Sequence, residues 1–167
     1  MTRGSGAKPA PRRVVVVEDS GVQRANLRRV IEADGDLAVV AEAGTAAEAV
    51  LAVRQARPHV ATIDLDIPGG GLEAIRSIMA TRPTPLLVVS AAVGGLRAAS
   101  VVEALASGAA DALPKPVRWS PGAEDDVRAR IRALTGIAIR SVPPTVSGCA
   151  DVVVAVAAST GGPAALA

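Results

Sequence analysis

The sequence predicts an α/β domain built on a parallel β-sheet. Between residues 13 and 136, short runs of β-branched and other apolar residues alternate with amphipathic segments of helical length. The short runs are apolar almost throughout, which is typical of strands whose two faces are both covered by helices. The length of 167 residues is enough for one such domain with an appendage.

The elements follow in a regular order along the chain. Ser20 and Thr45 stand directly before two of the amphipathic segments, where a hydroxyl can cap the first turn of a helix. Five strand–helix units fit a flavodoxin-like doubly wound sandwich with a five-stranded parallel sheet in the order 2-1-3-4-5. We expect strands at 13–17, 36–43, 59–64, 85–90 and 110–116, and helices at 20–34, 45–57, 71–82, 94–108 and 125–136.

The two ends of the chain differ in composition from this domain. Residues 1–12 are basic and rich in Gly and Pro, and we expect a disordered tail there. Residues 137–150 contain two consecutive prolines and are typical of a linker. After the linker one more apolar strand begins, so residues 151–167 are expected to form a truncated α/β segment.

Composition excludes several classes of function. The chain has no Phe or Tyr and a single Trp, so the aromatic platforms that stack on nucleic-acid bases are missing, and we expect no nucleic-acid partner. Cys149 is the only cysteine, which rules out a disulfide framework or a cysteine metal cluster. No apolar run reaches the roughly 20 residues of a membrane helix, and the VVVV run is too short for a signal peptide. We therefore expect a cytoplasmic protein without membrane insertion.

Polar residues stand where four of the predicted strands end. Glu18 and Asp19 end the first strand, Asp64 the third and Ser90 the fourth, and the fifth runs into Lys115. The carboxyl ends of parallel strands meet at one edge of the sheet, where such folds bind ligands. Carboxylates gathered there need a cation, and their oxygens suit Mg²⁺. The site has a chemical purpose if Asp64 is a nucleophile that accepts a phosphoryl group.

Each of these residues also has an ordinary structural explanation. An acid after a strand can cap the next helix, a lone serine is usually a loop hydroxyl, and a lone lysine is usually a surface charge. Their joint occurrence at four strand ends favours the functional interpretation.

At these residues the sequence resembles response-regulator receiver domains. The similar segments are VVVVEDS, IDLDIPGGGLEA, VVSA and ALPKP. The resemblance implies a cis peptide bond before Pro116 and a histidine kinase as phosphodonor. It also implies these roles: Asp64 as phospho-acceptor; Asp19, Asp64 and the backbone carbonyl of Asp66 as Mg²⁺ ligands, with Glu18 as outer-shell partner; Ser90 and Lys115 as contacts of the phosphoryl group.

Two positions depart from the receiver pattern. The loop after Pro68 is a run of three glycines, Gly69 to Gly71, one residue shorter than the family's usual stretch, and we expect it to be mobile. Ala112 stands where receivers usually carry Tyr or Phe. A rotamer switch of that ring is therefore impossible in this chain.

Further segments resemble the chemotaxis protein-glutamate methylesterase family, in which a receiver controls a hydrolase that demethylates or deamidates chemoreceptors. The segments are VEDS followed by Arg24, RPTPLLVVSA, SGAADALPKP and VAVAASTGGPAALA. By this resemblance Ser159 is a candidate esterase nucleophile, flanked by Ala157 and Gly161 in a small-residue version of the nucleophile elbow. The only histidine, His59, is expected at the opposite edge of the sheet, so no triad is complete and no efficient esterase activity is expected.

Two other interpretations stay open at this point. The chain could be a stand-alone receiver that docks a partner or shuttles phosphate. A mononucleotide-binding α/β protein is the weakest alternative, because the segment after the first strand, EDSGVQ, is acidic rather than rich in glycine.

Overall fold

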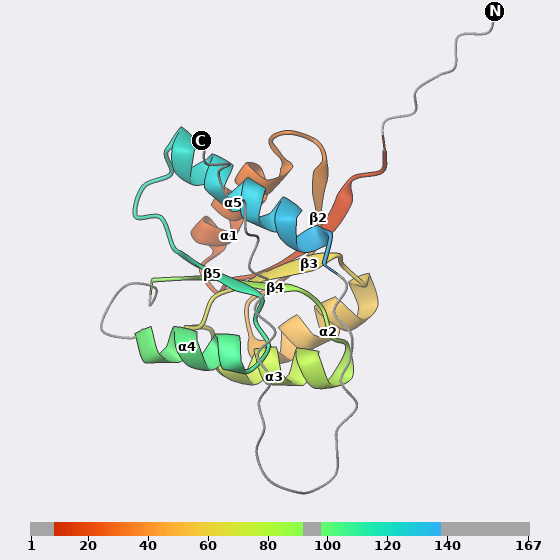
Figure 1. Ribbon diagram of the computed structural model, residues 1–167, viewed down its shortest axis with the longest axis vertical. Helices are drawn as coiled ribbons and strands as arrows, with labels where there is room; N and C mark the ends of the chain where they lie inside the picture. The colour runs from red at the N-terminus through yellow and green to blue at the C-terminus, as the bar shows by residue number, and fades with distance from the viewer. Residues whose placement is uncertain (1–8, 92–97, 138–167) are drawn as a thin grey trace, which may run out of the picture.

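The structure, a computed structural model, describes residues 9–91 and 98–137 (Figure 1). It contains a five-stranded parallel sheet in the order β2-β1-β3-β4-β5, which confirms the predicted fold class. The strands are β1 (Arg12–Val17), β2 (Leu37–Ala43), β3 (Val60–Ile63), β4 (Leu86–Ser90) and β5 (Asp111–Pro114). The helices are α1 (Gly21–Glu32), α2 (Ala46–Ala56), α3 (Gly71–Thr81), α4 (Ala98–Ala106) and α5 (Pro121–Thr135).

Helices cover both faces of the sheet. In Figure 1, α1 and α5 lie on one side and α2, α3 and α4 on the other. The strand β1 shows why both layers form, because Val14 and Val16 pack into the core under α1 and α5, while Val15 and Val17 pack into the core under α2 to α4. Apolar side chains on both faces of one strand require two covering layers.

The strand register brings the predicted site residues to one edge. Val17 is paired with Ile63, so β1 and β3 end side by side. The backbone N–H of Asp64 donates a hydrogen bond to the Val17 carbonyl at 3.0 Å. Ser90 is paired with Pro114 in the same way, which aligns the ends of β4 and β5. This carboxyl edge therefore collects the residues that follow four strands.

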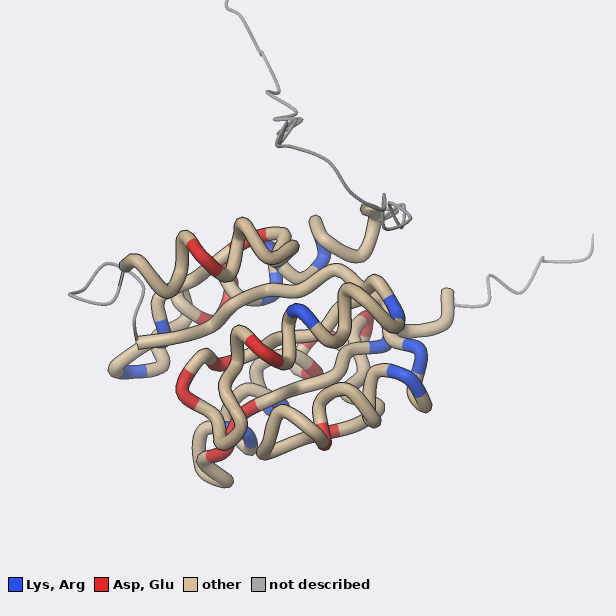
Figure 2. Tube along the Cα trace, turned by 90° about the horizontal axis from the view of Figure 1, so that it is seen from below, with Lys and Arg blue, Asp and Glu red and all other residues tan. Residues whose placement is uncertain are grey.

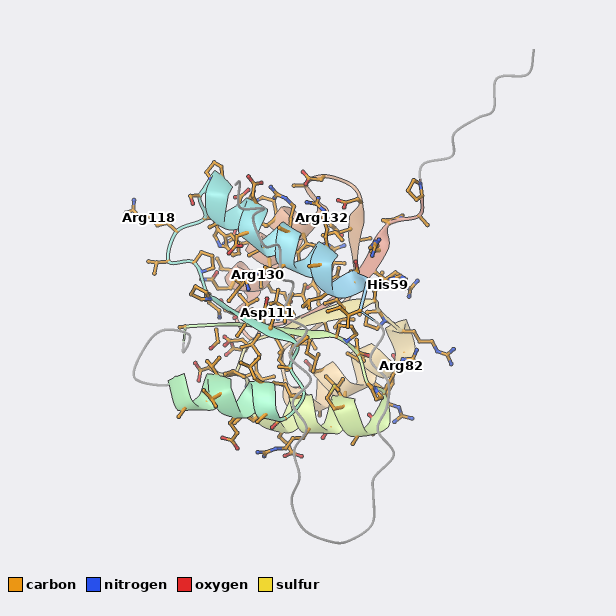
Figure 3. All side chains as sticks on the ribbon, viewed as in Figure 1. His59, Arg82, Asp111, Arg118, Arg130 and Arg132 are labelled. Atoms are coloured by element: carbon orange, nitrogen blue, oxygen red, sulfur yellow. The ribbon has the colours of Figure 1, made fainter. Side chains whose placement is uncertain are left out.

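The opposite, amino edge of the sheet is where the strands begin. Arginine positions gather beside the start of β1, at the point where the N-terminal grey trace joins the described chain (Figure 2). They include Arg12 and Arg13, the first two residues of β1. His59 lies at this edge, directly before β3 (Figure 3), as the sequence predicted.

The helix α5 begins at Pro121, four residues earlier than the predicted start at residue 125. The hydroxyl of Ser120 caps it by accepting a hydrogen bond from the backbone N–H of Ala123 at 3.3 Å. Pro121 suits the first helical position because the N–H that it lacks would have no partner there. The pair Ser120–Pro121 is the sequence signal of this helix start.

The predicted tail, linker and C-terminal segment lie largely outside the described residues, as does the beginning of the predicted helix 94–108. Ser159 is among these residues. Within residues 9–91 and 98–137, no helix combines the length and the apolar character that a membrane crossing needs.

Candidate functional site

Three carboxylates meet at the carboxyl edge of the sheet. Glu18 and Asp19 follow β1 and Asp64 follows β3, and one carboxylate oxygen from each lies within 4.8 Å of the others. Glu18 and Asp64 are buried, with 1% and 4% of their surface exposed, while Asp19 is open to solvent. The structure thus brings together the acidic residues that the sequence predicted to share a site.

Lys115 supplies the cation that these carboxylates need. Its Nζ lies 2.7 Å from Glu18 Oε2 and 2.5 Å from Asp64 Oδ2, so it bridges the ends of β1 and β3 from the end of β5. Like charges this close would repel strongly in a partly buried site, and the ammonium offsets that repulsion. Lys115 is therefore an integral member of the site rather than a surface charge.

Burial and charge act in opposite directions on the two ionisable partners. Burial raises the pKa of Glu18, and the hydrogen bond and charge of Lys115 offset this only in part. Burial alone would lower the pKa of Lys115, but hydrogen bonds and charges from Asp64 and Glu18 outweigh it, and the pKa is raised. Lys115 is therefore fully protonated at neutral pH and can serve as a permanent positive charge.

Ser90 and Asp66 complete the surroundings of Asp64. Ser90 is fully buried at the end of β4, and its carbonyl accepts a hydrogen bond from the Lys115 N–H at 3.1 Å. The backbone N–H of Asp66 donates to Asp64 Oδ1 at 3.3 Å. The contacts that these two residues make with a phosphoryl group or a metal stay predictions.

Each of the three glycines after Pro68 stands where a larger residue would be strained or would clash. Gly69 and Gly70 have φ angles of 85° and 83°, in the left-handed region that favours glycine. Gly71 begins α3, and a Cβ there would lie 2.5 Å from the Asp64 carbonyl oxygen and 2.6 Å from Leu65 Cα. The structure shows a turn that packs directly on the end of β3, and the expected mobility of this loop stays a prediction.

The peptide bond before Pro116 is trans, as are all peptide bonds of the described residues. The cis bond implied by the receiver resemblance is therefore wrong for this structure. The trans form is the favoured isomer of an X–Pro bond by about 0.5–1 kcal/mol. With this trans bond, Lys115 still reaches both Glu18 and Asp64.

Two other predicted features lie as expected. Ala112 is half-buried and packs against the core under α2 to α4, with only a methyl group where receivers usually carry a ring. His59 is exposed, and its Nδ1 accepts a hydrogen bond from the Arg13 N–H at 2.9 Å. The histidine therefore has a structural partner at the amino edge, away from the carboxylates.

Sequence reasoning used Arg24 only as part of the resemblance and assigned it no structural role. This residue lies on α1, and its Nη1 donates to the backbone carbonyl of Glu18 at 2.8 Å. The signal was the helical spacing of Arg24, Arg28 and Glu32, which places all three on one face of α1. It could have suggested an ionic network beside the acidic pair.

The donor set fits a hard divalent cation. Carboxylate oxygens are the ligands that Mg²⁺ prefers, and it commonly uses one or two carboxylates and keeps several waters. The side chains of Glu18, Asp19 and Asp64 could hold such an ion at this edge.

Comparison with known proteins places the chain in a family. A model of the response regulator receiver domain matches residues 14–124. The chain therefore belongs to the response-regulator receiver domain family. The crystal structure of the response regulator domain of Thermotoga maritima CheB is similar at a TM-score of 0.70 and 32% identity, covering 77% of this chain and 99% of that one.

Two relatives of known name are similar to this chain over most of its length. The chain is 38% identical over 175 residues to protein-glutamate methylesterase/protein-glutamine glutaminase 3 of Paramagnetospirillum magneticum, and 42% identical over 170 residues to the protein of the same name from Anaeromyxobacter dehalogenans. Each alignment covers 92% of this chain, but 48% and 49% of the relatives. The chain thus spans about half the length of these relatives, and its receiver is homologous to those of the methylesterases.

Proposed function

We propose that this chain is a phospho-accepting receiver in which Asp64 takes a phosphoryl group from a histidine kinase. One observation carries the proposal: the buried Asp64 carboxylate lies within 4.8 Å of two further carboxylates and 2.5 Å from the Lys115 ammonium. A carboxylate in this position can act as a nucleophile if positive charge balances the incoming phosphoryl oxygens.

In the proposed transfer, an oxygen of Asp64 forms a bond to phosphorus as the bond from phosphorus to the donor's imidazole nitrogen breaks. The imidazole leaves with the electron pair of that bond and takes a proton from solvent. Lys115 shifts its ammonium from the carboxylate to a phosphoryl oxygen, and the Ser90 hydroxyl donates to another. Asp19, Asp64 and the Asp66 carbonyl would hold Mg²⁺, with Glu18 as their outer-shell partner, and the ion would supply charge neutralisation for the transferring group.

The proposed output is control of a protein-glutamate methylesterase that demethylates or deamidates chemoreceptors. Support comes from the two relatives above, whose names state both activities. Ser159, outside the described residues, is the candidate nucleophile of that enzyme. His59 lies at the amino edge of the receiver, where its Nδ1 accepts a hydrogen bond from the Arg13 N–H, and we do not assign it as the base that such a serine requires.

Phosphorylation tests the receiver part of the proposal. The protein is incubated with Mg²⁺ and acetyl phosphate, and its intact mass is measured. Wild type should gain one phosphoryl group, and Asp64→Asn should gain none. Asp111→Asn is the matched control, because Asp111 pairs with Arg130 at the start of β5 and should leave the reaction unchanged. If Asp64→Asn is phosphorylated like wild type, the acceptor is a different residue.

Reading the gene past codon 167 tests the output part. A continuation that encodes further strand–helix units with a histidine and an aspartate would support the methylesterase. If unrelated sequence follows a stop codon, the stand-alone receiver that docks a partner or shuttles phosphate becomes the better interpretation.

A further inference from the structure

The backbone of Glu18 is held on both sides, by the end of β2 and by a side chain of α1. Its N–H donates a hydrogen bond to the Ala43 carbonyl at 2.9 Å. Its carbonyl accepts a hydrogen bond from Arg24 Nη1 at 2.8 Å. The guanidinium of Arg24 is itself fixed, because its Nε donates to Glu42 Oε2 at 3.1 Å. One guanidinium therefore ties the turn between β1 and α1 to the neighbouring strand.

Asp19 depends on this turn for its position. The carbonyl that Arg24 holds and the backbone nitrogen of Asp19 belong to one planar peptide group, so fixing the first orients the second. In the described part of the chain, no side chain or backbone group pairs with the Asp19 carboxylate, which is open to solvent. The position of the Asp19 backbone therefore limits where this carboxylate can lie relative to the other two.

The positive charge of Arg24 is neutralised locally. A bare guanidinium beside a cation site would weaken cation binding, but each Glu42 oxygen accepts from a different arginine, Arg24 at 3.1 Å and Arg28 at 2.9 Å. Arg28 in turn pairs with Glu32 at 3.3 Å. The ion pairs run in the order Arg24, Glu42, Arg28, Glu32. The two positive and two negative charges cancel, so Arg24 can donate hydrogen bonds near the acidic cluster without adding net charge.

We infer that Arg24 is a positioning residue that sets the affinity of the acidic cluster for Mg²⁺ by orienting the Glu18–Asp19 peptide group. This inference rests on the proposed function. Arg24 acts through the backbone and contacts neither the metal nor the phosphoryl group. Outer-shell partners of metal ligands typically change metal affinity by about 10–100-fold when they are removed.

Calorimetric titration of Mg²⁺ into the full chain tests this role. Arg24→Ala should bind Mg²⁺ about tenfold more weakly than wild type. Arg28→Ala is the matched control, because it loses ion pairs with Glu42 and Glu32 on the same helix face but does not touch Glu18. It should keep the wild-type affinity. Phosphorylation of Arg24→Ala should be slow at limiting Mg²⁺ and should recover at saturating Mg²⁺.

Two further measurements separate positioning from general stability. Arg24→Lys keeps the charge but cannot donate to both the Glu18 carbonyl and Glu42, so it should bind Mg²⁺ as weakly as Arg24→Ala. Urea unfolding in metal-free buffer should give similar stabilities for the two alanine variants. Equal Mg²⁺ affinities in Arg24→Ala and Arg28→Ala would overturn the inference.

A failure of the proposed function gives a different result. If wild type binds no Mg²⁺, or Asp19→Asn binds it equally well, both the metal site and the positioning role are wrong. If wild type binds Mg²⁺ and Asp19→Asn does not, while Arg24→Ala binds normally, only the role of Arg24 is wrong.

Discussion

The two edges of the sheet differ in how their charged groups are paired. At the amino edge charged and polar groups have complementary partners: Arg132 pairs with Asp34 and Asp36, and the ring of His59 accepts a hydrogen bond from the backbone N–H of Arg13. At the carboxyl edge three carboxylates share a small space with one lysine. The amino edge is arranged for stability, whereas the carboxyl edge holds a surplus of negative charge that a cation or a phosphoryl transfer can use.

The largest effect should come from packing at the carboxyl edge. Gly71→Ala would place a Cβ 2.5 Å from the Asp64 carbonyl oxygen, so the backbone must shift. We expect a loss of roughly 3 kcal/mol in unfolding free energy, together with loss of phosphorylation. Gly122→Ala is the control, because open space surrounds that position in α5, and it should stabilise the protein slightly. Equal unfolding free energies of the two variants in urea would contradict the close contact between Gly71 and the end of β3.

Removing the lysine should expose the repulsion at this edge. In Lys115→Met the buried carboxylates of Glu18 and Asp64 lose their cation, at a cost of about 2 kcal/mol in metal-free buffer. Added Mg²⁺ should restore part of the lost stability, because it supplies the missing positive charge. Thermal unfolding with and without Mg²⁺ measures both effects. A variant as stable as wild type without metal would mean that the carboxylates do not repel in the folded state.

The pH dependence of stability should show the buried charge of Glu18. Its folded pKa is raised above the ordinary value of 4.5, so its contribution is most favourable below that value and is lost as pH rises through the folded pKa. Glu18→Gln removes this loss. Its unfolding free energy should therefore exceed that of wild type at pH 8, and the gain should shrink toward pH 4. A gain that grows on acidification would contradict the sign of the shift.

The smallest effect should come from the amino edge. His59→Ala removes the acceptor of the Arg13 N–H, but water can replace it at this exposed position. We expect a loss of about 0.5 kcal/mol and an unchanged rate of phosphorylation. A large loss of phosphorylation in this variant would mean that the two edges are coupled.

The sequence predicted the order of elements and the residues at the strand ends because both follow from local patterns. An apolar run that stops at Asp64 marks the end of a strand, and parallel strands bring their ends together. It could not predict which way each backbone group points. Tertiary packing determines three such features: the left-handed φ of Gly69, the trans bond before Pro116, and the hydrogen bond from Arg24 to the Glu18 carbonyl.

The early start of α5 teaches a different lesson. Gly122 lowers helix propensity, but the cap from Ser120 and the packing of Val127 and Ile131 into the core outweigh that cost. The capping residue Ser120 is therefore a better guide to the start of α5 than helix propensity.

Lys115 has a consequence for the charge balance of the site. With the lysine included, the three carboxylates at the carboxyl edge leave two negative charges when all are ionised. A single divalent ion would bring that sum to zero, whereas a monovalent ion would leave one charge uncompensated. Attachment of a dianionic phosphoryl group to Asp64 would then return one negative charge to the neutral site. Phosphorylation of Asp64 would therefore add one negative charge at this edge of the sheet without the movement of an aromatic side chain.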